Sequence, residues 1–180
     1  MSLQLRLVCA SCFVVALAAG APVAAQADAT TGYRADLIRD LTGLEEKVVG
    51  LAEAVPADKY GWRPGEGVRS VSEAMMHLAA ANYFFPTLFG GSVPSGVDMA
   101  NLEKITDRAQ VLATLKSSFE HLRTLVRDTP DDKLDDAIKL FGQDATVAGA
   151  LHTAVAHGHE HLGQLIAYAR SIGVTPPWSG

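Results

Sequence analysis

Residues 146–171 read TVAGALHTAVAHGHEHLGQLIAYARS, and this stretch decides how the chain folds. Apolar residues and two histidines recur in it every three or four positions, which is the spacing of one face of an α-helix. The helix should end near Ser171, because Gly173 favours a helix stop and Pro176-Pro177 cannot continue one. The residues of this face are Val147, Ala150, Ala154, His157, His161, Leu165, Tyr168 and Ile172.

Two upstream segments have the same periodicity. Residues 33–54 are expected to form a helix that Pro56 ends, and residues 106–128 one that Pro130 ends. Each segment presents one apolar face, so each must pack against other helices. The first face consists of Leu37, Leu41, Leu44, Val48 and Leu51, and the second of Leu112, Leu115, Phe119, Leu122 and Val126.

A fourth helix should begin at Ser70. The sequence SVSE that starts there has the form of a capping box, in which Ser70 and Glu73 each bond the other's backbone amide. Pro86 should kink or end this helix, and the glycine pair at 90–91 stops it at the latest. Residues 137–141 could add a short strand or turn. Four amphipathic helices bury their apolar faces most simply against one another, so the prediction is an all-α four-helix bundle.

The N-terminal segment has the features of a secretory signal peptide. Arg6 is followed by an uncharged, mostly apolar run over residues 7–19. The sequence Ala-Gln-Ala at 25–27 then supplies small residues at the two positions that a signal peptidase reads. The apolar run is shorter than the roughly 20 residues of a membrane-spanning helix. We therefore expect cleavage of residues 1–27, export to the periplasm or the medium, no stable membrane anchor afterwards, and one domain over residues 28–180.

Removal of this segment changes the available chemistry. Residues 1–27 contain both cysteines, so the mature chain would have no disulfide, zinc–thiolate site or catalytic thiol of its own. They also contain one arginine and no acid, so the net charge goes from −5 to −6. An acidic surface argues against nucleic acid as a partner, because nucleic-acid binding requires clustered Lys and Arg. Any metal ion would have to be bound by His, Asp or Glu.

Three histidines stand out by position. His157 and His161 lie four residues apart on the apolar face of the last helix. His77 lies between Ala74 and Ala81 on the inward face of the helix that begins at Ser70, the second along the chain. Three imidazoles therefore point into one bundle from two helices. Spacing alone leaves two readings open: core histidines satisfied by hydrogen bonds, or ligands that share one cation.

The other three histidines should lie away from this site. His159 is two positions from either ligand candidate and His152 is five before the first, while His121 follows the core residue Phe119 by two and should face solvent. Glu160 is a reserve ligand or a hydrogen-bond acceptor for an imidazole, although such an acid is more often a solvated surface residue.

Two blocks of sequence resemble the DinB-like (DinB/YfiT) superfamily of four-helix-bundle metal-dependent proteins. One covers residues 62–73 and runs into Met76-His77-Leu78; the other is HxxxHxGQL from His157, continuing through residues 168–177. The resemblance implies an up-down-down-up bundle with a metal-binding triad that corresponds here to His77, His157 and His161. It also implies zinc or nickel as the metal and favours a homodimer.

The expected function is that of an exported metal-dependent enzyme of unknown substrate, hydrolase-like, with a metal-activated water. A non-catalytic bundle that binds a metal or a ligand is the alternative. The resemblance also allows a thiol-dependent S-transferase, which export away from cytosolic thiols disfavours. No catalytic residue is fixed by spacing: the acid–base candidates are Glu160, Tyr83 and Asn82, and the aromatic residues Trp62 and Tyr168 either line the site or belong to the core.

Overall fold

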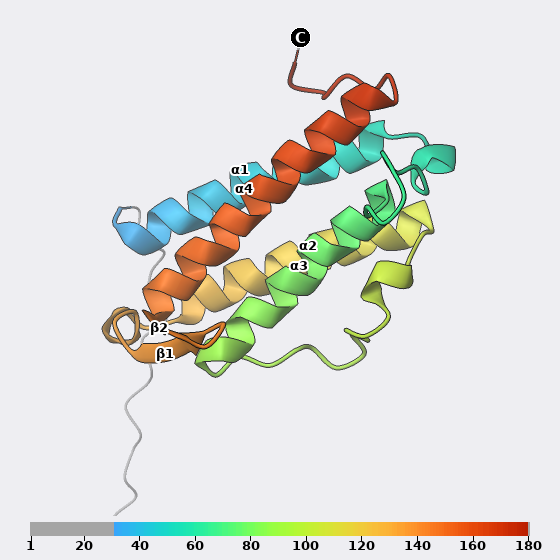
Figure 1. Ribbon diagram of the computed structural model, residues 1–180. Helices are drawn as coiled ribbons and strands as arrows, with labels where there is room; N and C mark the ends of the chain where they lie inside the picture. Colours follow the sequence, from blue (N-terminus) through green and yellow to red (C-terminus); the bar gives the residue numbers. More distant parts are fainter. Residues whose placement is uncertain (1–30, 180) are drawn as a thin grey trace, which may run out of the picture.

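The computed structural model describes residues 31–179. The proposed signal peptide, residues 1–27, lies outside this range. Four α-helices form the body of the molecule (Figure 1), and their bounds agree closely with the periodicity of the sequence. They are α1 (Tyr33–Ala54), α2 (Val71–Phe84), α3 (Arg108–Asp128) and α4 (Val147–Ser171).

The helices form a bundle in which α1 and α4 run in one direction and α2 and α3 in the other (Figure 1). Helix α4 packs against α1 and α2, and α3 packs against the same two helices. The all-α, up-down-down-up four-helix bundle is therefore confirmed. The order places α2 and α4 side by side in antiparallel orientation, so the second and fourth helices share one face of the molecule (Figure 1).

The helix ends follow from local side-chain hydrogen bonds. Ser70 Oγ accepts from the Glu73 amide at 3.2 Å and Glu73 Oε2 accepts from the Ser70 amide at 2.8 Å, so the capping box is confirmed. The third helix begins two residues later than the sequence suggested, because the Asp107 side chain caps it by accepting from the Gln110 amide at 2.9 Å.

Shorter elements connect the helices. The 3₁₀ helix η2 (Phe85–Phe89) contains Pro86, so the α-helical hydrogen bonding of α2 ends just before that proline, as predicted. Three more 3₁₀ helices occur within the described residues: η1 (Ala57–Lys59), η3 (Leu102–Lys104) and η4 (Asp131–Lys133). Strand β1 (Ala137–Leu140) pairs antiparallel with β2 (Gln143–Thr146) and confirms the short strand expected near residue 137.

The core fills the space between the four helices. Its fully buried large side chains come from every helix and include Leu44, Met75, Phe119 and Leu151. Among residues 31–179, no helix combines the length and the apolar character that crossing a membrane requires.

Candidate metal centre

The three histidines chosen by spacing meet between α2 and α4. Each of His77, His157 and His161 offers one ring nitrogen, and these nitrogens lie within 4.8 Å of one another. The ring centroids are 4.9 Å apart for His77 and His161 and 5.3 Å apart for His77 and His157. The Nε2 atoms of His157 and His161 are 3.1 Å apart. The i, i+4 spacing on α4 thus brings two imidazoles together, and α2 supplies the third.

The triad lies at the edge of the core. His161 is 9% exposed, whereas the His77 side chain is 29% exposed. The histidines are therefore shielded on the α4 side and reachable from solvent on the α2 side. This combination suits a site that binds an ion and admits a small molecule.

His77 Nδ1 is hydrogen-bonded to a carboxylate that the sequence analysis did not identify. Glu103 Oε1 lies 2.8 Å from His77 Nδ1, and Arg69 donates to both oxygens of Glu103, at 2.9 and 3.2 Å. Because an ionised carboxylate can only accept, Nδ1 of His77 carries the proton. The Nε2 lone pair of His77 is then free for a metal ion.

A neutral amide does the same for His161. Gln164 Oε1 lies 2.7 Å from His161 Nδ1, and Gln164 Nε2 donates to the Tyr168 hydroxyl at 2.8 Å. The amide therefore presents its oxygen to His161, so that Nδ1 of His161 is protonated and Nε2 carries the lone pair. The Tyr168 ring in turn packs edge-on against Trp62, with 5.5 Å between ring centroids. Tyr168 is buried in the core, and Trp62 is a partly buried residue that packs against it.

Burial keeps the two imidazoles of α4 neutral. It lowers the pKa of His157 to about 4, with further lowering by the nearby charges of His161 and His77. Burial also lowers the pKa of His161, against the hydrogen bond to Gln164, which raises it. Burial raises the pKa of Glu103, but the hydrogen bonds from Arg69 and His77 outweigh it and bring this pKa below its usual value. The carboxylate of Glu103 is thus ionised and the two imidazoles of α4 are neutral near neutral pH, which is the state that metal binding requires.

The donor set fits a divalent cation. The Nε2 atoms of His157 and His161 face each other at hydrogen-bond distance. Because His161 Nε2 carries a lone pair, it can accept one hydrogen bond from His157 or bind a cation. His157 Nδ1 is buried without a hydrogen-bond partner among residues 31–179. Three neutral imidazoles are ligands that zinc and nickel both accept, and they leave room for further ligands.

The comparisons with known proteins identify the family. The family model of the DinB superfamily matches residues 40–165. The chain belongs to the DinB superfamily. The uncharacterized protein YjoA of Bacillus subtilis is 29% identical over 128 residues, which cover 69% of this chain and 81% of YjoA.

Solved structures of the superfamily share the fold. The crystal structure of YjoA has a TM-score of 0.63 at 23% identity, covering 78% of this chain and 93% of YjoA. A DinB-like protein of Bacillus cereus gives 0.65 at 15% identity, covering 83% and 100% of the two chains. YfiT of Bacillus subtilis gives 0.63 at 19% identity, covering 79% and 89%, and is described as a probable metal-dependent hydrolase with an unusual four-helix bundle topology.

The acid–base candidates lie elsewhere in this DinB superfamily member. Glu160 is exposed and does not contribute to the group of converging ligand atoms. Asn82 is buried and donates to Ser118 Oγ on α3 at 3.2 Å, so it belongs to the contact between α2 and α3. Tyr83 is buried as well, with its ring 5.4 Å from the ring of His121. The structure brings none of the three into the triad.

One histidine differs from the sequence expectation. His121 was expected to face solvent, yet its Nε2 is buried without a hydrogen-bond partner in the described part of the chain, and burial lowers its pKa. The reason is that α3 packs against both α1 and α2, so its buried face is wider than one apolar stripe. His159 is exposed and lies 2.8 Å from Asp40 on α1, and His152 is exposed, both as expected from their positions.

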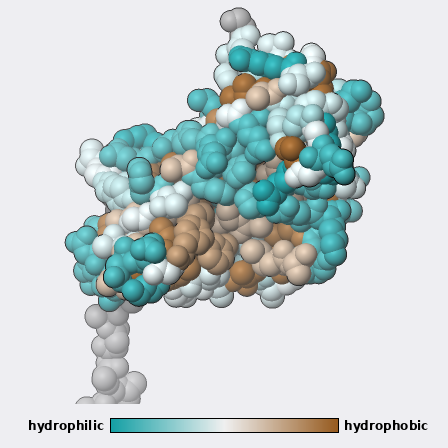
Figure 2. All heavy atoms as spheres, viewed as in Figure 1, coloured by the Kyte–Doolittle hydropathy of each residue, from teal (hydrophilic) through white to brown (hydrophobic). Residues whose placement is uncertain are grey.

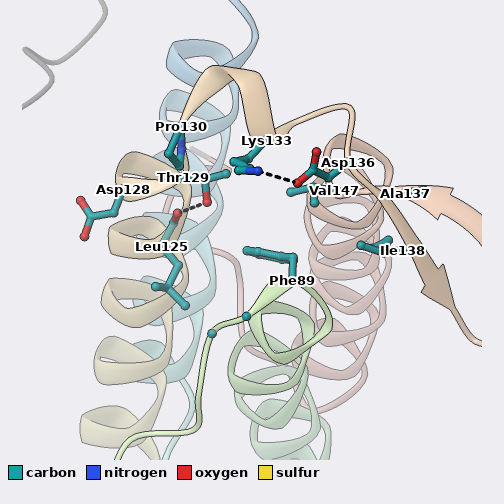
Figure 3. A pocket seen from close by; sticks show the side chains of 12 residues that line it. Phe89, Leu125, Asp128, Thr129, Pro130, Lys133, Asp136, Ala137, Ile138 and Val147 are labelled. Atoms are coloured by element: carbon teal, nitrogen blue, oxygen red, sulfur yellow. Dashed lines mark hydrogen bonds and ion pairs between the residues drawn. The ribbon is translucent and has the colours of Figure 1, made fainter.

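A separate pocket lies away from the triad, where the end of α3 meets η2 and the hairpin (Figure 3). It has a volume of about 390 Å³. Phe89 points into it, and Lys133 and Asp136 form an ion pair of 3.2 Å at its edge (Figure 3). Because no histidine lines it, this pocket offers no metal ligands of the kind found in the triad.

Proposed function

We propose that this protein is a metal-dependent hydrolase whose divalent ion, zinc or nickel, is held by His77, His157 and His161. The observation that carries the proposal is the convergence of three imidazole nitrogens within 4.8 Å from two helices. The description of the structurally similar YfiT as a probable metal-dependent hydrolase supports it.

The chain's own residues prepare the site. Glu103 and Gln164 fix the ring orientation and the proton position of His77 and His161, and burial keeps His157 neutral. A bound divalent ion would supply Lewis acidity, which polarises a carbonyl or phosphoryl oxygen and lowers the pKa of a water molecule. The partly exposed His77 side chain gives a small-molecule substrate access to the centre.

Cobalt substitution tests whether this centre is open, as catalysis requires, or closed, as in a structural site. The cobalt-loaded protein should show visible absorption bands that shift when azide is added. They should also shift with pH, because a catalytic site contains an ionising group next to the metal.

A spectrum that responds to neither azide nor pH would mean a closed shell of ligands. The protein would then be a non-catalytic metal-binding bundle, and the hydrolase proposal would be wrong. His77→Ala is the informative variant for activity, since His77 alone joins α2 to α4 in the triad. Once a substrate is found, this variant should have lost turnover even when excess metal restores occupancy.

A further inference from the structure

Three phenylalanines form a cluster at the end of α2 and the tip of the hairpin. Phe84 and Phe85 are adjacent, with ring centroids 5.9 Å apart. Phe141, in the turn between β1 and β2, stacks on Phe84 at 6.1 Å with an angle of 15° between the rings and lies 6.2 Å from Phe85. We call Phe84, Phe85 and Phe141 the aromatic wall.

The aromatic wall is continuous with the histidine triad. The Phe85 ring lies 6.1 Å from the ring of His157 and is only 3% exposed. The other two rings extend outward from it, with Phe84 37% and Phe141 70% exposed. A row of packed aromatic rings therefore leads from a candidate metal ligand to solvent. Figure 2 shows an apolar patch beside the hairpin on this side of the molecule.

The backbone at Phe141 is unfavourable for a bulky side chain. Its φ of 50° is in the left-handed region, and Gly142 beside it has a φ of 84°. Two-residue turns of this kind favour Asn, Asp or Gly at the first position, where a bulky side chain is unfavourable. A large apolar ring exposed to water on such a backbone suggests a role in binding.

The other end of α2 is polar. Arg69 precedes the helix, His77 lies within it, and Phe84 ends it. Because Arg69 and Glu103 form an ion pair beside His77, charged groups lie toward the start of α2 and aromatic groups toward its end. A substrate at the triad would meet an apolar surface on one side and a charged one on the other.

We propose that the aromatic wall binds an aromatic or other flat apolar group of the substrate, next to the bond that is hydrolysed at the triad. This proposal rests on the proposed function. A second protein chain suits the wall less well, because a stable interface buries roughly 800 Å² per partner. Two partly exposed phenylalanines, at roughly 200 Å² each when fully exposed, supply well under half of that area.

Hydroxamates of increasing size test the proposal on the zinc-loaded protein. Acetohydroxamate reports an open metal centre alone, while benzohydroxamate and 3-phenylpropanohydroxamate add a ring at two distances from the metal-binding group. At least one of the aromatic compounds should bind tenfold or more tightly than acetohydroxamate in calorimetric titrations.

Substitution of the wall should remove this preference. Phe141→Asn is suitable because asparagine favours the turn, and Phe84→Ala can be combined with it. Affinity for the aromatic hydroxamate should fall to that of acetohydroxamate, whose binding should not change. Trp178→Ala is the matched control, since Trp178 is also exposed, at 40%, but comes after the C-terminal end of α4, whereas the hairpin precedes the N-terminal end.

Other outcomes would overturn the proposal. Equal affinities for all three compounds, or an aromatic preference that survives in the double variant, would show that the wall does not bind the ligand. A change from dimer to monomer in sedimentation, with the preference unchanged, would assign the wall to a subunit interface. Failure of acetohydroxamate itself to bind would remove the open metal centre and the proposal with it.

Discussion

Glu103 is the single residue that most directly determines the geometry of His77. Its carboxylate holds His77 Nδ1 at 2.8 Å and is itself held by Arg69. Outer hydrogen bonds of this kind typically change metal affinity by about 10–100-fold. Glu103→Ala should therefore weaken zinc binding by roughly that factor in competition with a chromophoric chelator. Glu46→Gln, which removes an exposed acid on α1, should leave the affinity unchanged.

Wild-type affinity in Glu103→Ala would show that the contact between Glu103 and His77 has no part in metal binding. A conservative variant separates charge from geometry. Glu103→Gln can still accept from His77 but loses the ion pair with Arg69, so its affinity should lie between that of Glu103→Ala and that of the wild type.

The buried imidazoles make the stability of the metal-free protein depend on pH. Burial lowers the pKa of His157 to about 4 in the folded state, whereas an unfolded histidine titrates near 6.5. Between these values the unfolded chain binds more protons, so stability is fully present above about pH 6.5 and is lost as the pH falls toward about 4. The urea midpoint, measured in chelator, should decrease across this range.

The comparison of variants isolates this effect from that of the carboxylates. His157→Gln should show a shallower decrease between about pH 6.5 and 4, because glutamine does not ionise. His152→Gln, at an exposed position on the same helix, should follow the wild type. An unchanged slope in His157→Gln would assign the pH dependence to other groups.

Single residues also mark the limits of what the sequence predicts about the site. His157 and His161 were identifiable because a fixed helical spacing places them on one face. Glu103 was not, since it lies in η3, a 3₁₀ turn within an irregular segment where no periodicity indicates direction. His121 was placed wrongly because its helix has two packed neighbours, and one apolar stripe cannot show how wide the buried face is.

Among the elements, α1 and α4 approach each other closely at Gly158, between the two histidines. A Cβ added there would lie 2.4 Å from Leu44 Cδ2, and Leu44 is only 1% exposed. Gly158→Ala should force the helices apart or displace this leucine and cost about 1–3 kcal/mol of unfolding free energy, measured by urea denaturation.

Gly163 on the same helix provides the control. A Cβ there meets no atom within 4 Å, and the position is exposed. Gly163→Ala should therefore stabilise the protein by up to about 1 kcal/mol through helix propensity alone. If Gly158→Ala were equally stabilising, α1 and α4 would not approach each other closely at Gly158.

The helices themselves follow from the sequence more fully than their connections do. Stops such as Pro56 and the capping box at Ser70 fix the ends of helices through local chemistry. Strand β2 was not predicted, because Gln143 and Asp144 are polar and exposed and show no alternation of apolar residues. The strand forms because it pairs with β1, which is a contact that no local pattern reveals.

For the whole molecule, the packing order of the four helices came from family resemblance, since amphipathic faces alone do not say which helices are neighbours. The same is true of the choice between satisfied core histidines and metal ligands. Three imidazoles that meet from α2 and α4 are a property of the assembled bundle.

Export is a prediction about the whole chain. Protein recovered outside the cytoplasm of its host should begin at Asp28, because cleavage after the Ala-Gln-Ala site removes residues 1–27. N-terminal sequencing of the exported fraction measures this directly. A chain that accumulates in the cytosol and still begins at Met1 would contradict it.

The metal content of the purified protein tests the central claim most directly. Elemental analysis should find one zinc or nickel ion per chain in the wild-type protein, with an affinity that falls at acid pH as the imidazoles become protonated. The His157→Ala/His161→Ala double variant should retain its helical circular dichroism and contain no stoichiometric metal. Metal retained at one ion per chain in that variant would show that His77, His157 and His161 are not the site.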